Sequence, residues 1–216
     1  MKLSDDLRKE YMKAGKLNDK QIADALGTIN VPETGAKATA VAAAEDGVRE
    51  LLVDLMVISA RYNEAARASK KDAREIIPAD ELARDREVLE AMIGPEYHLA
   101  NPFGKSEGRD ETINKFLSGT IRPDAFGQAG FKSSEHTLQV HADDGNPHTA
   151  VSHGRLKFKG KGAVEYKESG RVRWLDLTGE YRTTHTFIYR DGRWQITASQ
   201  MTKIPDKAAF NFVGEK

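Results

Sequence analysis

Residues 179–204 read GEYRTTHTFIYRDGRWQITASQMTKI, and this stretch determines the fold class that the sequence predicts. Residues typical of strands lie on both sides of Asp191 and Gly192, as in two antiparallel strands joined by a short loop. Asp-Gly supplies the two positive-φ residues of a type I′ turn, and that turn fixes which residues face each other. Counting outward from the turn predicts five pairs: Arg190–Arg193, Tyr189–Trp194, Phe187–Ile196, His185–Ala198 and Thr183–Gln200.

One face of this hairpin is apolar, and we expect it to lie against the core. Its apolar residues are Tyr189, Trp194, Phe187 and Ile196. In the predicted register His185, Thr183 and Gln200 share that concave side of the sheet. The residues between them, Arg182, Thr184 and Thr186, are expected to face outward.

Helical patterns come before the strands. Apolar residues recur at three- and four-residue steps from Asp46, which predicts a long amphipathic helix with Tyr62 on its buried face. A second helix is predicted from Pro78 to about Gly94, then a strand at residues 96–101 and a short helix at 110–117. Further strands are predicted at residues 136–142, 149–159 and 171–177. Helices followed by strands indicate the α+β class.

The first 45 residues contain two short helical patterns, one after Ser4 and one after Asn18, where Gln21 is placed for a capping box. Residues 28–45 contain a Pro, a Gly and an Ala-rich run, and we interpret them as a linker. The sequence thus predicts a helical arm and linker at 1–45, a main domain at 46–205 and a tail at 206–216. The arm is expected to dock on the main domain or on a second subunit.

The composition excludes several classes of partner. Lys plus Arg and Asp plus Glu are equal at 33 each, so no net charge attracts nucleic acid. No apolar run reaches the roughly 20 residues that span a bilayer, and the N-terminus lacks the apolar core of a signal peptide. We therefore expect a cytoplasmic protein without membrane contact. The chain has no cysteine, which excludes disulfides and thiolate chemistry.

The order of predicted elements resembles the nuclear transport factor 2-like (NTF2-like) superfamily, which includes SnoaL-like polyketide cyclases, ketosteroid isomerases and scytalone dehydratase. NPFG at residues 101–104, EGRDETI at 107–113 and the final hairpin carry the likeness. The resemblance covers residues 46–205. It implies a cone in which a strongly curved antiparallel sheet wraps around the helices and encloses a pocket, and it implies a homodimer through the outer face of the sheet.

The resemblance also implies candidate site residues. Ketosteroid isomerases use an Asp as general base, with a Tyr and a protonated Asp as oxyanion donors. Asn101 matches the base, and a carboxamide cannot take a proton, so that mechanism is disfavoured. Tyr62 matches the oxyanion Tyr in an Ala-Arg-Tyr stretch. His185 falls on the position of the protonated Asp, where it is a candidate general acid or base.

Each candidate also has a structural interpretation. His185 is either catalytic or a core histidine bonded to Thr183 or Gln200, and Tyr62 on an apolar helix face is more typical of a core residue. Asn101 either binds a ligand carbonyl or braces the turn before Pro102. Thr183, Gln200, Trp194 and Phe187 are expected to line the same pocket as ligand-binding residues. His136, His141, His148 and His153 differ in strand parity, so no metal site is predicted.

Two functions remain open at this point. The first is a SnoaL-like pocket protein that binds an apolar or polycyclic compound and catalyses an acid-base isomerisation, dehydration or cyclisation without a cofactor. The alternative is a non-catalytic, dimerising interaction module whose pocket is filled by its own side chains. Asn101 in place of Asp favours the second function, and an inward-facing His185 favours the first.

Overall fold

The computed structural model describes residues 2–31, 38–124, 130–143, 146–166 and 171–205. Five helices and a 3-10 turn lie mostly ahead of the strands in the described chain. They are α1 (Asp5–Ala14), α2 (Asp19–Leu26), α3 (Ala38–Ser69), η1 (Ala73–Glu75), α4 (Ala79–Met92) and α5 (Arg109–Ser118). The α+β class is therefore confirmed. None of the described helices is long and apolar enough to cross a membrane.

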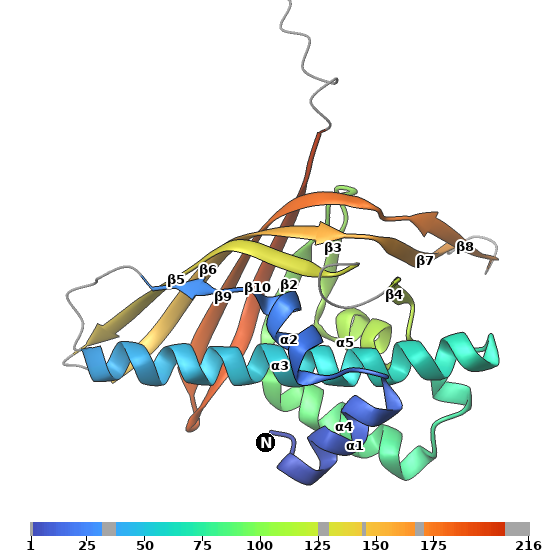
Figure 1. Cartoon of the computed structure of the whole chain (residues 1–216), viewed down its shortest axis with the longest axis horizontal. Helices are drawn as coiled ribbons and strands as arrows, with labels where there is room; N and C mark the ends of the chain where they lie inside the picture. The colour runs from blue at the N-terminus through green and yellow to red at the C-terminus, as the bar shows by residue number, and fades with distance from the viewer. Residues whose placement is uncertain (1, 32–37, 125–129, 144–145, 167–170, 206–216) are drawn as a thin grey trace, which may run out of the picture.

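The main sheet has seven strands in the order β1-β5-β6-β9-β10-β2-β3 (Figure 1). Its strands are β1 (Ile29–Asn30), β2 (Ile93–Ala100), β3 (Ser106–Gly108), β5 (Lys132–Asp143), β6 (Asn146–Phe158), β9 (Gly179–Arg190) and β10 (Arg193–Ile204). β1 pairs with β5, and β2 with β10, in parallel, whereas the other pairs are antiparallel. A smaller sheet joins β4 (Ile121–Pro123), β7 (Gly160–Tyr166) and β8 (Arg171–Asp176).

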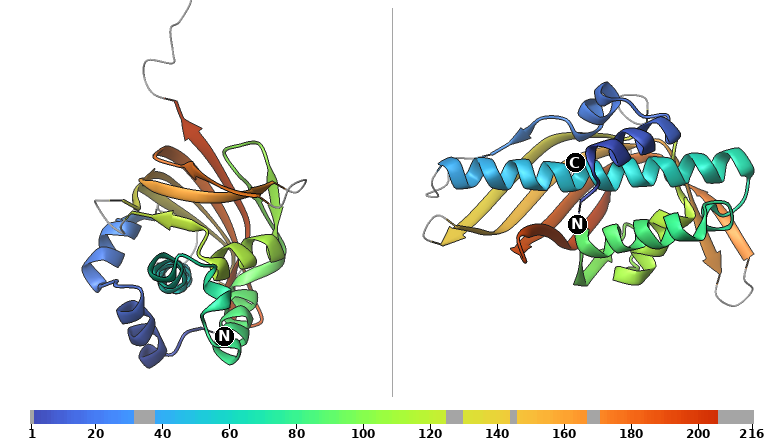
Figure 2. Two further views of the ribbon diagram at one scale, coloured as in Figure 1. Left: turned by 90° about the vertical axis from the view of Figure 1, so that its right-hand side faces the viewer. Right: turned by 90° about the horizontal axis from the view of Figure 1, so that it is seen from below.

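Helix α3 lies at the centre of the molecule. Seen along its axis in Figure 2, it has the curved sheet above it, α1 and α2 on one side, and α4 and α5 on the other. Its residues Val48, Leu51, Ile58 and Tyr62 are buried. Burying such a side chain contributes about 1.5–3 kcal/mol each, so this helix supplies a large share of the core.

The predicted linker is wrong in its C-terminal part, because α3 begins at Ala38 and not at Asp46. Alanine has the highest helix propensity, and no proline interrupts residues 38–45, so the Ala-rich run continues the helix. The linker is also wrong at Ile29 and Asn30, which form β1 against β5.

The N-terminal arm docks on the main domain. Tyr11, Ile22 and Leu26 are buried in the same core cluster as α3. The capping box of Asn18 and Gln21 is present at the start of α2, as predicted. Arg8 of α1 bonds the buried Asp54 of α3, with 2.8 Å between Nε and Oδ1. Of the two predicted docking places, the structure therefore shows the first. The predicted tail, 206–216, lies outside the described residues.

The final hairpin has the predicted turn, with Asp191 at φ 53° and Gly192 at φ 73°. The pairs Tyr189–Trp194 and Phe187–Ile196 are confirmed. The next two predicted pairs are wrong, because a bulge between Ile196 and Ala198 moves β10 on by one residue. An extra residue in one strand shifts every later pair.

After the bulge, His185 pairs with Ser199 and Thr183 pairs with Met201. Gln200 pairs with Thr184 and is exposed, so its predicted place on the concave side is wrong. The bulge thus replaces Gln200 by Ser199 as the polar neighbour of His185.

Candidate functional site

A row of polar side chains crosses the inner face of the sheet, the face that covers α3. His185 of β9 stands between Ser152 of β6 and Ser199 of β10 in the strand register. Nδ1 of His185 and Oγ of Ser199 are 2.9 Å apart, and Ser199 also hydrogen-bonds the hydroxyl of Tyr97 on β2. We call Ser152, His185, Ser199 and Tyr97 the inner-face row. Three separate segments of the chain, β2, β6 and the β9–β10 hairpin, bring these residues together.

The two titratable groups of the row are uncharged at neutral pH. Burial lowers the pKa of His185 to about 4, and the neighbouring His136 adds a smaller effect in the same direction. Burial likewise raises the pKa of Tyr97. Since both shifts favour the neutral form, the row presents hydrogen-bonding groups without a net charge.

One aromatic residue and one hydroxyl-bearing residue flank His185 along the strand. Phe187 is fully buried, and the centres of its ring and the His185 ring are 6.3 Å apart. Thr183 lies on the other side of His185 and is partly buried. The imidazole therefore sits between an aromatic ring and a hydroxyl, at the border of the core.

Trp194, one of the predicted ligand-binding residues, packs directly on helix α3. A Cβ atom added to Gly47 would lie only 2.5 Å from Cδ1 of Trp194. The indole therefore occupies the space that the glycine leaves, and it is buried. In this structure Trp194 fixes the sheet on α3.

The hydroxyl of Tyr62 reaches helix α4, which lies with α1 on the side of α3 away from the sheet (Figures 1 and 2). This hydroxyl donates to Oδ2 of Asp85 at 2.8 Å, and Arg61 and Tyr11 bind the same carboxylate. Burial, with Asp85 next to it, raises the pKa of Tyr62. The structure thus brings Tyr62 to Asp85 and does not bring it to His185.

Asn101 braces the turn that follows β2. Its Oδ1 accepts from the backbone N–H groups of Phe103 and Lys105 at 3.0 Å each, and its Nδ2 donates to Glu107 at 2.7 Å. Both ends of the carboxamide are therefore engaged within the chain. Of the two predicted roles, the turn brace is the one with contacts in the structure.

Sequence reasoning missed Ser152, Ser199 and Tyr97 as site residues. Tyr97 could have been found from its strand parity, since it lies two residues before Leu99 in β2. Ser199 could not, because its inward direction depends on the bulge in β10. His136, for which the sequence predicts no metal site, is buried on β5 near the row.

The inner-face row is neither a metal site nor part of the cavity described next. Among the residues that the structure describes, no group of three or more His, Asp or Glu side chains is placed to hold a metal ion. A cavity of about 190 Å³ lies between the arm and the C-terminal half of α3, with Lys16, Asn63, Glu64 and Arg67 in its lining. This cavity is separate from the inner-face row.

No family model matches the sequence, and no curated protein matches it either. Solved structures do show similarity. The similar structures include proteins described as NTF2-like, a protein with a cystatin-like fold, a CaMKII association domain and a dehydrochlorinase. An NTF2-like protein from Cytophaga hutchinsonii has a TM-score of 0.41 and 23% identity, and the match covers 57% of this chain and 85% of that one.

Two further structures cover more of the chain. A type 2 hexachlorocyclohexane dehydrochlorinase (LinA) has a TM-score of 0.43 and 10% identity over 78% of this chain and 90% of that one. The association domain of CaMKII from C. elegans has a TM-score of 0.41 and 10% identity over 77% and 100%. The resemblance to the NTF2-like superfamily predicted from sequence is thus found again as a likeness of fold alone.

Proposed function

We propose that the chain is a SnoaL-like pocket protein that binds an uncharged apolar or polycyclic compound at the inner-face row. The observation that carries the proposal is the His185–Ser199 pair, a polar contact of 2.9 Å placed beside the fully buried Phe187. Small-molecule sites combine an apolar lining with a few convergent polar groups, and this arrangement supplies both.

The row also supports acid-base chemistry in which His185 acts as the base. Ser199 occupies Nδ1 of the imidazole, so Nε2 is the nitrogen available to a ligand. A neutral imidazole accepts a proton from a carbon or hydroxyl of the ligand, and it then returns that proton to a different atom of the same molecule. Such a transfer isomerises the ligand when the proton returns to another carbon or oxygen atom, and it dehydrates the ligand when the proton is given to a hydroxyl group that leaves as water. It requires no cofactor.

The neutrality of the row selects the ligand. An ionic group brought beside His185 would lose its hydration and gain no partner of opposite charge from the row. We therefore expect preference for ketones, alcohols and aromatic hydrocarbons over carboxylates or amines.

The test uses an uncharged solvatochromic dye, Nile red, and the variant His185→Ala. The variant is expected to keep the circular dichroism of the wild type and to lose at least about threefold in dye affinity, because the site loses a polar contact. Thr184→Ala, a neighbouring change on the outer face, serves as the control and should bind as the wild type does. Equal affinity of His185→Ala and wild type, with a lower melting temperature, would assign His185 a purely structural role.

The alternative function, a non-catalytic interaction module, is favoured by one specific observation. Asn101 and Tyr62 match the catalytic residues of ketosteroid isomerases. The polar groups of both side chains form hydrogen bonds with other residues of this chain. In that case the chain would dimerise through the outer face of its sheet as a cytoplasmic scaffold. Failure of wild type to bind Nile red would favour this alternative.

A further inference from the structure

We propose that the N-terminal arm, residues 2–31, completes the ligand site, and that His136, which the arm holds in place, binds a hydroxyl group of the ligand. The inference rests on the proposed function and names the part of the ligand that this region recognises.

A bulge in β5 determines the direction of His136. Ser134 pairs with Arg155 and Thr137 with His153, so Glu135 and His136 together stand opposite the single residue Gly154. Glu135 takes the left-handed conformation, with φ 52°, and its carboxylate bonds Arg155 and Arg182. His136 is directed to the other face, where it is 6% exposed. Bulges of this kind re-aim side chains beside functional sites.

Gly154 shows that His136 shares a face with the inner-face row. A Cβ atom on Gly154 would lie 3.6 Å from Cδ2 of His136 and 3.5 Å from Oγ1 of Thr183. Gly154 and Thr183 are partners in the register, and Ser152 and His185 form the next inward pair along the same two strands. His136 therefore borders the row at the edge of the sheet that the arm covers.

The arm contacts β5 at this residue. β1 runs parallel to β5 with Ile29 opposite His136, and the backbone carbonyl of Leu26 hydrogen-bonds the His136 ring. The approach is close enough to require glycine next to Leu26. Gly27 has φ 65°, and a Cβ atom there would lie 2.6 Å from the carbonyl oxygen of Ser133. The arm is thus held firmly where it meets His136.

Two buried polar atoms beside this contact have no partner in the described part of the chain. They are Nδ1 of His136 and Oγ of Ser152, a residue with no exposed surface. Buried polar groups are normally hydrogen-bonded, so two neighbouring exceptions on one face indicate a partner that comes from outside the chain.

The chemistry of the two atoms identifies that partner. A carbonyl only accepts, so the ring hydrogen of His136 lies on the nitrogen facing Leu26, and Nδ1 presents a lone pair. Burial lowers the pKa of His136, which keeps that lone pair free of a proton at neutral pH. A hydroxyl group donates to Nδ1 and exchanges a second hydrogen bond with Ser152, whereas a ketone oxygen cannot bond Nδ1.

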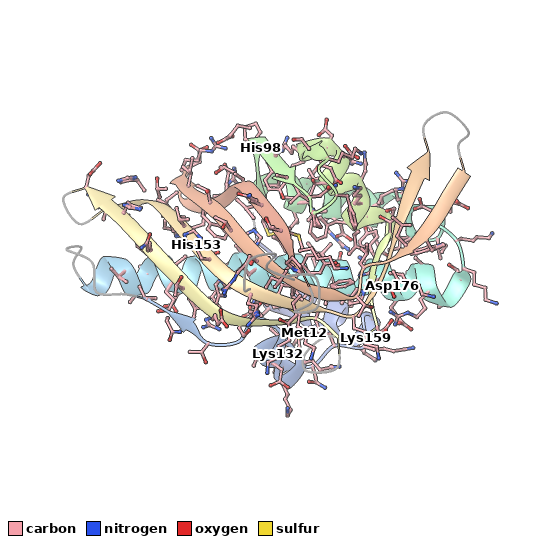
Figure 3. All side chains as sticks on the ribbon, turned by 90° about the horizontal axis from the view of Figure 1, so that it is seen from above. Met12, His98, Lys132, His153, Lys159 and Asp176 are labelled. Carbon is pink, nitrogen blue, oxygen red and sulfur yellow. The ribbon has the colours of Figure 1, made fainter. Side chains whose placement is uncertain are left out.

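The experiment compares 2-naphthol with naphthalene, which differ by one hydroxyl group, on the full chain. We expect wild type to bind 2-naphthol about tenfold more tightly than naphthalene, a difference of about 1.4 kcal/mol. His136→Leu and Ser152→Ala should each remove most of this preference, measured as the ratio of the two affinities within each variant. His153→Leu, a histidine on the outer face of β6 that is labelled in Figure 3, is the matched control.

A variant in the arm tests the second half of the proposal. Gly27→Ala forces the α2–β1 connection away from Ser133 and should reduce the preference for 2-naphthol as His136→Leu does. Nitrogen-15 NMR of the His136 ring supplies a readout that is independent of affinity, because 2-naphthol should shift Nδ1 and naphthalene should not.

The outcomes separate the two proposals. If neither compound binds, the proposed function fails and this inference fails with it. If both bind equally and the Nδ1 signal responds to neither, water satisfies the two atoms and only this inference is overturned. If Gly27→Ala keeps the full preference while remaining folded, the arm has no part in the site.

Discussion

Asp85 has no exposed surface, yet three neighbours from two other helices donate to its carboxylate. Tyr11 of α1 and Arg61 and Tyr62 of α3 all bond it, and the guanidinium of Arg61 lies 4.1 Å from the centre of the Tyr11 ring. A buried carboxylate is stable only when charged and hydrogen-bonding partners surround it. At the scale of single residues, this cluster joins α1, α3 and α4.

We therefore expect Asp85→Asn to destabilise the fold by about 3–5 kcal/mol, because Arg61 loses a buried counter-charge. Unfolding in urea measures the change. Glu81, which also bonds Arg61 but is more exposed, provides the matched variant, and Glu81→Gln should cost about 1 kcal/mol or less. Equal losses in the two variants would contradict the central role of Asp85.

His185 gives a prediction for pH. Its pKa is about 4 in the folded chain and roughly 6.5 when unfolded, so between these values the unfolded state binds the extra proton. Stability contributed by neutral His185 is complete above about pH 6.5 and is lost as the pH falls toward 4. The free energy of unfolding should fall by up to about 1.4 kcal/mol per pH unit in this window. His185→Asn should flatten that slope, and an unchanged slope would show that His185 is already charged in the fold.

At the scale of elements, helix α3 and the final hairpin make contact through a glycine and a tryptophan. Gly47 lies within α3, where glycine is normally unfavourable, and Trp194 fills the space above it. Glycine at position 47 lowers the helix propensity of α3, but it allows the sheet to pack closely on the helix.

Because of this contact, the effect of a Gly→Ala substitution on stability should have the opposite sign to the usual one. Gly→Ala inside an exposed helix usually stabilises by about 0.5–1 kcal/mol, but Gly47→Ala should destabilise by about 1–3 kcal/mol since its Cβ would overlap the indole. Thermal unfolding measures both single changes and the combination with Trp194→Leu. In the Trp194→Leu variant, Gly47→Ala should no longer lower the stability. If it still does, the strain arises from a contact other than the one with Trp194.

The elements also show how far the sequence could predict the fold. The turn at Asp191 and Gly192, the long helix predicted from Asp46 and the α+β class follow from local patterns, and all are present, although the helix begins earlier, at Ala38. The bulge after Ile196 and the parallel pairing of β1 depend on contacts between distant segments, which no local pattern carries. The local hairpin pattern predicts that His185 faces inward. It does not identify Ser199 as the neighbour of His185, because that pairing depends on the bulge.

At the scale of the whole molecule, the outer face of the sheet is the broadest surface of strands left uncovered by helices (Figure 3). Its centre holds the neighbours Val151, Thr186 and Ala198, which are small or apolar. At one end of this face, Glu135 forms ion pairs with both Arg155 and Arg182. In a dimer with two-fold symmetry, this centre of one subunit would pack against the same centre of the other subunit.

We expect a dimer mass by light scattering at micromolar concentration. Thr186→Arg should convert it to a monomer without changing the circular dichroism, because two charges would face each other across the axis. Lys71→Glu, an exposed change between α3 and α4, should leave the mass unchanged. A monomeric wild type would remove the outer face as a subunit contact.

The parallel pairing of β2 with β10 has a consequence for synthesis. β2 ends at Ala100, and its neighbour β10 begins only at Arg193, so β2 stays unpaired on that side while more than ninety further residues are made. Contacts between such distant segments slow folding, because the chain must close long loops before they form. β2 therefore gains this partner only after Arg193 and the residues beyond it have been made, and a nascent chain halted before Arg193 would expose an unpaired strand edge to chaperones and to other chains.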